Sequence, residues 1–285
     1  MAERMARAMR MCMIISCKHD IMDKVKGEGW RMKEIFVTGK TLPEAYHKAI
    51  LALYNEGDVS SCNDWNQKQK EVSMTFVAEN PLEEPMVSRL YIGGFYELQQ
   101  YVMEVLDGIL DFKIGDGTCW EYTYHDRLVN YNGFNQVEFI INELQRNSDT
   151  RRAVAIIRDN KVDPFNVDPA CLQHMQFFIR ENKLHCKVLM RSNDATEASF
   201  MNAFAFVMLQ KFIAKKLKVK VGSYTHRANS YHCYEKDFKL LEQYIDGIKN
   251  KPLADITYNY KDYYKEIMEE CIDDIKAAVQ VIKKG

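Results

Sequence analysis

The chain has 285 residues, 47% of them hydrophobic, and a formal net charge of -1. A chain of this length can bury one substantial core, or a core with a small appendage. The charge balance gives no sign of a nucleic-acid or membrane surface, and the apolar stretches stay well short of the roughly 18 residues that span a bilayer.

The first twelve residues are basic and rich in methionine, but they lack the long apolar run and the cleavage site of a signal peptide. A strand-like segment starts at Met13. We therefore expect residues 1–12 to be a disordered or tag-like extension. No repeat, low-complexity tract or glycine-serine linker interrupts the remainder, so residues 13–285 are expected to form a single domain.

The eight cysteines form no C-x-x-C pair and no spacing with histidine that is typical of a metal site. Reduced thiols in a cytoplasmic protein, with no bound metal, are the simplest interpretation. A buried structural role remains open for each of them, because cysteine is among the most buried residue types.

Along the chain, Thr41-Leu-Pro-Glu44 is a capping-box pattern that predicts a helix through about Tyr54. Residues 71–77 are typical of a strand, and a helix is expected over residues 96–108. A further amphipathic helix ends near Asn147, because apolar side chains recur at helical spacing in Val137, Ile140, Ile141 and Leu144.

The second half begins with residues 153–157, an apolar run short enough for a buried strand. Two β-rich segments, 174–180 and 184–190, follow and are joined by a three-residue polar turn, 181–183. Residues 201–217 predict a helix buried on most faces, and residues 260–284 a charged amphipathic helix. Helices and strands mix without regular βαβ alternation, which predicts an α+β fold, or α/β with a mixed sheet.

A β-hairpin brings its two outer ends together, and here those ends carry Cys171 and Arg191. Only the thiolate form of cysteine is a good nucleophile, and a nearby fixed positive charge favours it. Arginine supplies that charge at every ordinary pH. This pairing makes Cys171 a candidate nucleophile, with an ordinary core cysteine as the alternative.

Five separated elements around this cysteine resemble the signature of the thymidylate synthase family, most strongly over residues 149–241. They are Asp168-Pro-Ala-Cys171 with Gln176, Lys183-Leu-His-Cys186, Arg191-Ser-Asn-Asp194, Asn202, and His232-Cys-Tyr234. Upstream segments are similar to the archaeal-type branch of that family, among them Val37-Thr-Gly-Lys, Asn80-Pro-Leu-Glu and Tyr122-Thr-Tyr-His-Asp-Arg. The resemblance implies one large bent sheet flanked by helices.

The resemblance also implies a chemistry, in which Cys171 adds to C6 of the uracil ring of dUMP and makes C5 nucleophilic. Asn202 stands at the position of the base-reading asparagine, whose amide donates to O4 and accepts from N3–H. The related deoxycytidylate hydroxymethylases carry an aspartate there. An asparagine that caps the following helix is the alternative interpretation.

For the rest of the nucleotide, the resemblance implies that Arg191 and Ser192 bind the phosphate. Arg151 and Arg152 would reach across a homodimer interface to the partner's phosphate, because guanidinium groups meet phosphate oxygens two at a time. In isolation, a solvated arginine pair at a helix-strand junction is the better interpretation, and only the register with the other family elements favours the phosphate role. The sugar 3'-hydroxyl is assigned to His232 and Tyr234, and further substrate contacts to Asp194, Gln176 and Tyr124.

A general acid and base is expected on the helix over residues 96–108, where Glu104 is the first candidate and Glu97 the second. Leu172 and His125 depart from the family pattern, and the chain ends in Lys-Lys-Gly285 without the apolar tail that closes over the cofactor in common members. The resemblance implies that the cofactor is a reduced pterin one-carbon carrier, and both 5,10-methylenetetrahydrofolate and methylene-tetrahydromethanopterin fit these residues.

Three functions follow from these residues. The first is reductive methylation of dUMP to dTMP by a thymidylate synthase, a methyltransferase. The second is hydroxymethylation of dCMP, CMP or dUMP on the same scaffold. The third is a non-catalytic nucleotide-binding protein that keeps the pocket for sensing or for RNA binding.

Overall fold

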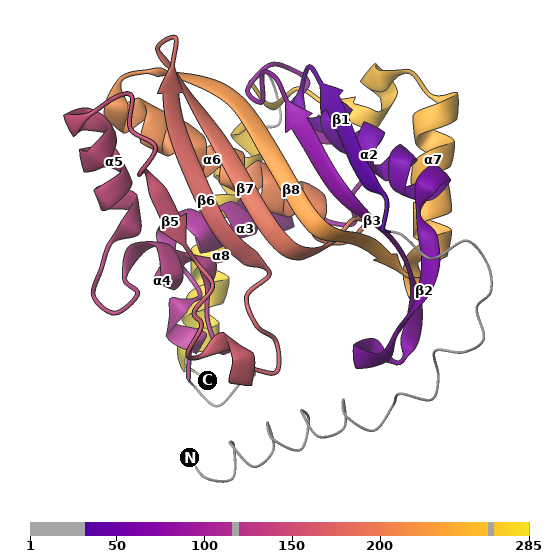
Figure 1. Ribbon diagram of the computed structural model, residues 1–285, viewed down its shortest axis with the longest axis horizontal. Helices are drawn as coiled ribbons and strands as arrows, with labels where there is room; N and C mark the ends of the chain where they lie inside the picture. The colour runs from indigo at the N-terminus through magenta and orange to yellow at the C-terminus, as the bar shows by residue number, and fades with distance from the viewer. Residues whose placement is uncertain (1–31, 116–119, 262–264, 285) are drawn as a thin grey trace.

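The computed structural model describes residues 32–115, 120–261 and 265–284. The expected extension over residues 1–12 and the strand at Met13 lie outside the described residues. Within them, the chain builds one large sheet with helices packed against it (Figure 1). None of the described helices has both the length and the apolar composition of a membrane span.

The large sheet is mixed, as the sequence predicts. Its strands run in the order β1-β3-β8-β7-β6-β5, with β2 paired to β3. The β1–β3 and β7–β8 pairs are parallel and the other pairs are antiparallel. The strand bounds are β1 Glu34–Gly39, β2 Asp58–Cys62, β3 Gln67–Ala78, β5 Val154–Ile156, β6 Leu172–Arg180, β7 Lys183–Asp194 and β8 Lys220–Tyr234, and a separate small sheet pairs β4 Val87–Ser88 with β9 Thr257–Tyr258.

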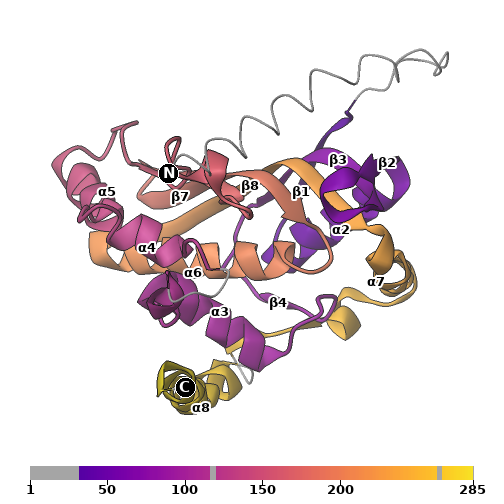
Figure 2. The same cartoon turned by 90° about the horizontal axis from the view of Figure 1, so that it is seen from below.

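The helices form layers below the sheet. Figure 2 shows α6 next to the strands, α3 beyond it and α8 outermost. The predicted helices are all present within a few residues of their expected bounds. Helices α4 and α7 were not predicted. The helix bounds are α2 Leu42–Glu56, α3 Phe95–Asp107, α4 Tyr124–Val129, α5 Gln136–Arg146, α6 Ser199–Leu217, α7 Phe238–Asn250 and α8 Lys265–Lys284.

Local sequence signals explain where these helices begin. The Thr41 hydroxyl accepts a hydrogen bond from the Glu44 backbone N–H and caps α2, as the capping-box pattern predicts. In the same way, the Asn135 side chain caps α5. Helix α6 is buried over most of its length, which explains its nearly continuous apolar sequence.

Two details of the strands differ from the expectation. The hairpin turn between β6 and β7 has two residues rather than three, and both Glu181 and Asn182 have positive φ, which matches the right-handed twist of the flanking strands. Strand β5 forms the edge of the sheet and is buried on one face only: Ala155 is fully buried, whereas Ile156 on the opposite face is 54% exposed. An apolar run cannot by itself distinguish an edge strand from a central one.

One face of the sheet packs on the helices, whereas the other carries a row of cross-strand neighbours that are only half-buried or exposed. Met74, Met175 and Met190, on the helix-covered face, are fully buried. On the opposite face, Phe36 is 66% exposed. The row on that face, in register from β1 to β5, is Phe36, Thr75, Arg227, Leu189, His174 and Ile156.

Candidate active site

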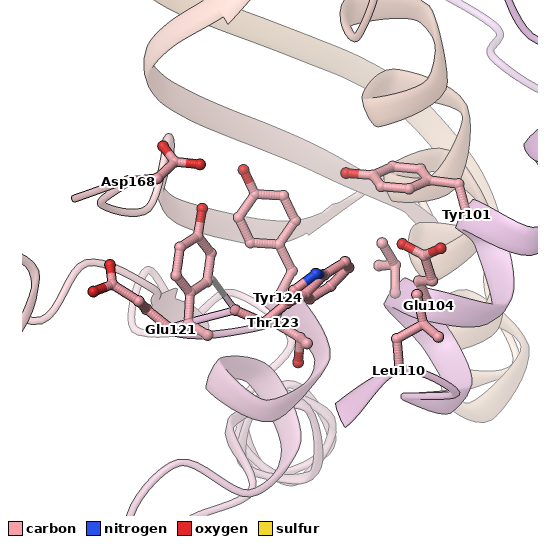
Figure 3. A pocket seen from close by; sticks show the side chains of 10 residues that line it. Tyr101, Glu104, Leu110, Glu121, Thr123, Tyr124 and Asp168 are labelled. Carbon is pink, nitrogen blue, oxygen red and sulfur yellow. The ribbon is translucent and has the colours of Figure 1, made fainter. Parts of the chain in front are cut away.

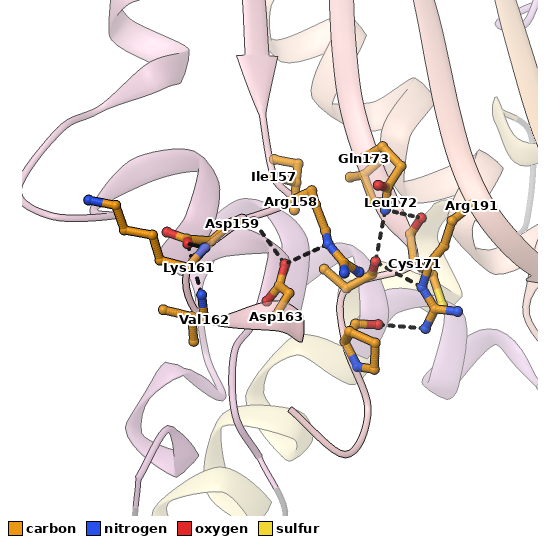
Figure 4. Close-up of polar contacts among 12 residues, drawn as sticks. Ile157, Arg158, Asp159, Lys161, Val162, Asp163, Cys171, Leu172, Gln173 and Arg191 are labelled. Atoms are coloured by element: carbon orange, nitrogen blue, oxygen red, sulfur yellow. Dashed lines mark hydrogen bonds and ion pairs between the residues drawn. The ribbon is translucent and has the colours of Figure 1, made fainter. Parts of the chain in front are cut away.

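The hairpin brings Cys171 and Arg191 together, as predicted. Cys171 directly precedes β6, and Arg191 lies on β7 next to Met190, the partner of Leu172. The Arg191 backbone N–H donates to the Cys171 carbonyl oxygen at 2.7 Å. Figure 4 shows both side chains at this end of the hairpin.

The guanidinium of Arg191 holds the loop that carries the thiol. It donates through Nη2 to the Pro169 carbonyl at 2.7 Å and through Nε to the Ala170 carbonyl at 3.2 Å. Asp168 lies 3.9 Å from the same group. Arg191 therefore fixes the backbone just before Cys171, while its partly exposed side chain remains available to an anion.

The electrostatics of the thiol differ from the expectation. Burial raises the pKa of Cys171 above its ordinary value, and this outweighs the lowering by the charges of Arg191 and Arg158. Asp168 raises this pKa further. The charge of Arg191 favours the thiolate, as expected, but the loss of solvent around the thiol outweighs it. The sequence does not show how much solvent the fold removes.

A buried ion pair supports the loop from the other side. Arg127 on α4 is 2% exposed and donates to Asp163, which is fully buried, at 2.8 Å. Arg127 also donates to the Ile157 carbonyl at 2.9 Å. Arg158 lies 3.7 Å from Asp163, and Figure 4 shows these two side chains. These contacts join α4 to both ends of the segment between β5 and the loop of Cys171.

A cavity of about 400 Å³ opens beside the loop. Aromatic rings form much of its wall, and carboxylates face it from two sides (Figure 3). This size and lining suit a flat heterocycle, which rings can stack on and carboxylates can hydrogen-bond. The residues concerned are Tyr101, Trp120, Tyr122, Tyr124, Glu104 and Asp168.

Tyr124 connects the cavity to the nucleophile. Its hydroxyl accepts a hydrogen bond from the backbone N–H of Leu172 at 3.3 Å. Burial raises the pKa of Tyr124 well above its ordinary value, and the neighbouring Cys171 contributes to this rise. The tyrosine therefore remains a neutral hydroxyl beside the thiol.

The two candidate glutamates on α3 have different surroundings. Glu104 lines the cavity and accepts from Gln100 Nε2 at 2.8 Å. Burial raises the pKa of Glu104 above its ordinary value. Glu97 instead accepts from the Gly94 backbone N–H at 2.7 Å and caps α3. The cavity position and the raised pKa favour Glu104 as the proton-transfer group.

The residues expected around the sugar and phosphate lie on adjacent strands. Ser192 Oγ is 3.4 Å from His232 Nδ1. The rings of His232 and Tyr234 meet edge to face with centroids 4.6 Å apart, and Trp65 packs its ring against Tyr234 at 6.5 Å. Burial lowers the pKa of His232, so its imidazole is a neutral hydrogen-bonding group at pH 7.

Asn202 and Asp194 have clear structural partners. Asn202 lies inside α6, whose N-cap is Ala198, so the interpretation of Asn202 as a helix cap was wrong. Its Oδ1 accepts from the hydroxyl of Tyr101. Asp194 Oδ1 accepts from the backbone N–H groups of Thr196 and Glu197, both at 2.9 Å, and so stabilises the turn that leads into α6.

Three predicted site residues are not brought to Cys171 within one chain. Arg151 and Arg152 are exposed and directly precede β5. Gln176 pairs with Val154 on β5, and its Nε2 donates to the Arg151 carbonyl at 2.9 Å. The place of Arg151 and Arg152 in a nucleotide site therefore depends on a second subunit. The substrate contacts of all three residues stay predictions.

Sequence reasoning missed Tyr101, Tyr122, Asp163 and the role of Arg127. Tyr101 stands three residues before Glu104, so both fall on one face of α3, and that spacing could have indicated it. The pairing of Arg127 with Asp163 could not be predicted from the sequence, because the two residues are far apart in the chain and neither lies in a recognisable local pattern.

Comparison with known proteins places the chain in a family. The thymidylate synthase family model matches residues 58–279. The chain thus belongs to the thymidylate synthase family. It is 31% identical over 215 residues to a protein of Methanocaldococcus jannaschii named "Putative thymidylate synthase", an alignment that covers 72% of this chain and 93% of that protein.

Two further comparisons extend this result. The thymidylate synthase of Bacillus mojavensis is 26% identical over 168 residues, which is 58% of either chain. The solved structure of the thermostable thymidylate synthase A from Bacillus subtilis superimposes with a TM-score of 0.59 at 17% identity, over 78% of this chain and 96% of that one. The second likeness confirms the predicted fold.

Proposed function

We propose that the protein is a thymidylate synthase that converts dUMP to dTMP. The observation that carries the proposal is the position of Cys171, held by Arg191 beside a ring-lined cavity that Glu104 faces. A nucleophile and a cation next to a cavity that a half-buried acid lines match the needs of covalent activation of a uracil ring.

In this proposal, the Cys171 sulfur forms a bond to C6, and the electron pair of the C5–C6 double bond moves to C5 and O4. The amide of Asn202 donates to O4 and stabilises the charge that develops there. C5 takes up the one-carbon unit from a bound carrier, which departs as the leaving group and supplies the hydride that reduces this carbon to a methyl group. The C5 proton leaves toward Glu104 through water, and breaking the C6–sulfur bond then restores the thiolate of Cys171.

The cavity residues also suit a reduced pterin. The rings of Trp120, Tyr122 and Tyr124 would hold a flat heterocycle, and the carboxylate of Asp168 could accept from its N–H groups. When bound, a methylene-carrying pterin supplies both the carbon and the hydride that a methyl product requires. Tetrahydrofolate and tetrahydromethanopterin both present this chemistry.

We propose further that the active unit is a homodimer. The half-exposed row on the sheet face opposite the helices, with Phe36 at one edge and Ile156 at the other, is left open by the part of the chain that the structure describes. It is the kind of surface that an oligomer buries. In such a dimer Arg151 and Arg152, which are exposed in one chain, would bind the partner's nucleotide phosphate.

Trapping with 5-fluoro-dUMP tests the reaction. Fluorine at C5 cannot leave as a cation, so the enzyme should stall as a covalent complex with 5-fluoro-dUMP and methylenetetrahydrofolate or methylene-tetrahydromethanopterin. Intact-protein mass spectrometry should show this complex for the wild type and for the control Cys271→Ala, on α8, but not for Cys171→Ala. Nucleotide binding without any adduct would point to a non-catalytic protein. A product from dUMP one oxygen heavier than dTMP would identify a hydroxymethylase.

A further inference from the structure

A hydrogen bond between two helices joins Tyr101 to the base-reading asparagine. The Tyr101 hydroxyl on α3 donates to Asn202 Oδ1 on α6, across the packed interface of these helices. Asn202 is 5% exposed, and Tyr101 forms part of the cavity wall. Figure 3 shows the Tyr101 ring reaching from α3 with its hydroxyl directed across the cavity toward Tyr124.

The direction of this bond determines which end of the amide is free. An asparagine side chain carries two N–H donors at one end and an acceptor oxygen at the other, and it can rotate to exchange them. Among the described residues, Asn202 Oδ1 is the acceptor for the Tyr101 proton. Rotating the amide would face its N–H group toward the phenol oxygen and leave that proton without this acceptor.

Tyr101 also keeps its proton. Burial raises the pKa of Tyr101 well above its ordinary value, and the nearby Glu104 raises it further. The phenol therefore acts as a donor at every pH at which the protein would work. With Oδ1 held in this way, Nδ2 of Asn202 is the end available as a donor, and one lone pair remains on Oδ1.

We propose that Tyr101 is a positioning residue that fixes the polarity of the Asn202 amide and thereby selects 4-oxo over 4-amino pyrimidines. The inference rests on the proposed function, since it assumes that Asn202 reads the base. In the fixed orientation the amide donates to O4 of uracil and accepts from N3–H. In cytosine the 4-amino group, a donor, would face the donor Nδ2, and the unprotonated N3, an acceptor, would face the acceptor Oδ1. Neither hydrogen bond can then form.

The rotated amide would have the opposite preference. Its oxygen would accept from the 4-amino group of cytosine, and its N–H group would donate to N3. Asn202 alone is therefore compatible with both bases, and the selection depends on the partner that prevents rotation. That partner is a single hydroxyl group, which makes the idea open to a conservative test.

The test is Tyr101→Phe, which removes the hydroxyl and keeps the ring. We expect the preference for dUMP over dCMP, measured as the ratio of kcat/KM values and as the ratio of Kd values by calorimetry, to fall roughly 5- to 150-fold, the change that one unmade buried hydrogen bond represents. Tyr122→Phe is the matched control, because it removes a hydroxyl from the same cavity wall without a bond to Asn202. It should leave the ratio within about twofold, the scatter expected of such ratios.

A second background tests the mechanism itself. A carboxylate has acceptors at both ends and therefore no polarity to fix. In the Asn202→Asp variant, adding Tyr101→Phe should leave the dUMP to dCMP ratio unchanged. An unchanged ratio in Tyr101→Phe alone, or an equal fall in both backgrounds, would overturn the inference. Failure of the proposed function is a different result, in which the wild type neither binds nor converts dUMP.

Discussion

Replacing Asp163 with asparagine removes one charge from the buried pair that supports the nucleophile loop. Asp163 is fully buried and Arg127 is 2% exposed, so water cannot compensate for the loss. The new amide would also set its N–H group against donors, because the Asp159 backbone N–H donates to Asp163 Oδ2 at 2.8 Å and Arg158 lies 3.7 Å from it. The arginine would be left as an uncompensated buried charge.

Breaking a buried pair in this way costs about 3 to 5 kcal/mol of unfolding free energy. For a chain of this size, each kcal/mol lowers Tm by about 2 °C, so Asp163→Asn should melt roughly 6 to 10 °C below the wild type. Urea unfolding followed by circular dichroism measures the free energy directly. Asp273→Asn on α8 is the control, because Asp273 is 96% exposed and should leave the midpoint unchanged.

The double variant Arg127→Met, Asp163→Asn adds a sharper comparison. Removing both charges eliminates the uncompensated ion, so the double variant should be more stable than the sum of the two single losses implies. A loss below about 1 kcal/mol in Asp163→Asn, or strict additivity in the double variant, would show that the pair does not act as a buried unit.

Three further predictions concern titratable groups. Arg191→Gln should raise the pKa of Cys171 further, because it removes a charge that lowers this pKa. The thiol should then react more slowly with iodoacetamide at pH 8, as measured by peptide mass spectrometry, and equal or faster alkylation would contradict the electrostatic role of Arg191. Glu104→Gln should reduce kcat by a factor of roughly 10² to 10⁴. It should also remove from the pH profile of kcat an inflection that lies above the ordinary carboxyl pKa. An unaltered profile would assign proton transfer to another group. Burial lowers the pKa of His226 from 6.5 to about 3. The contribution of this histidine to the unfolding free energy should therefore be complete above pH 6.5 and fall by roughly 1.4 kcal/mol per pH unit as the pH drops toward 3. The urea midpoint of His226→Gln should decline less steeply with falling pH than that of the wild type, and equal slopes would refute the assignment.

The local elements of the fold were predictable because their signals are local. Capping at Thr41, helical periodicity near Val137 and the nearly continuous apolar run of α6 each depend on neighbours within one or two turns. The position of β5 at the sheet edge was not predictable, because strand order depends on packing between distant segments.

In the candidate site, too, the contacts between residues close in sequence were predictable and the long-range contacts were not. The hairpin spacing by itself placed Cys171 next to Arg191, since a tight turn joins residues that are close in sequence. Burial of the thiol, the ion pair of Arg127 with Asp163, and the hydroxyl that orients Asn202 were decided only by the tertiary structure. Desolvation and buried hydrogen bonds depend on which distant parts of the chain the fold brings together, and local sequence patterns do not predict these contacts.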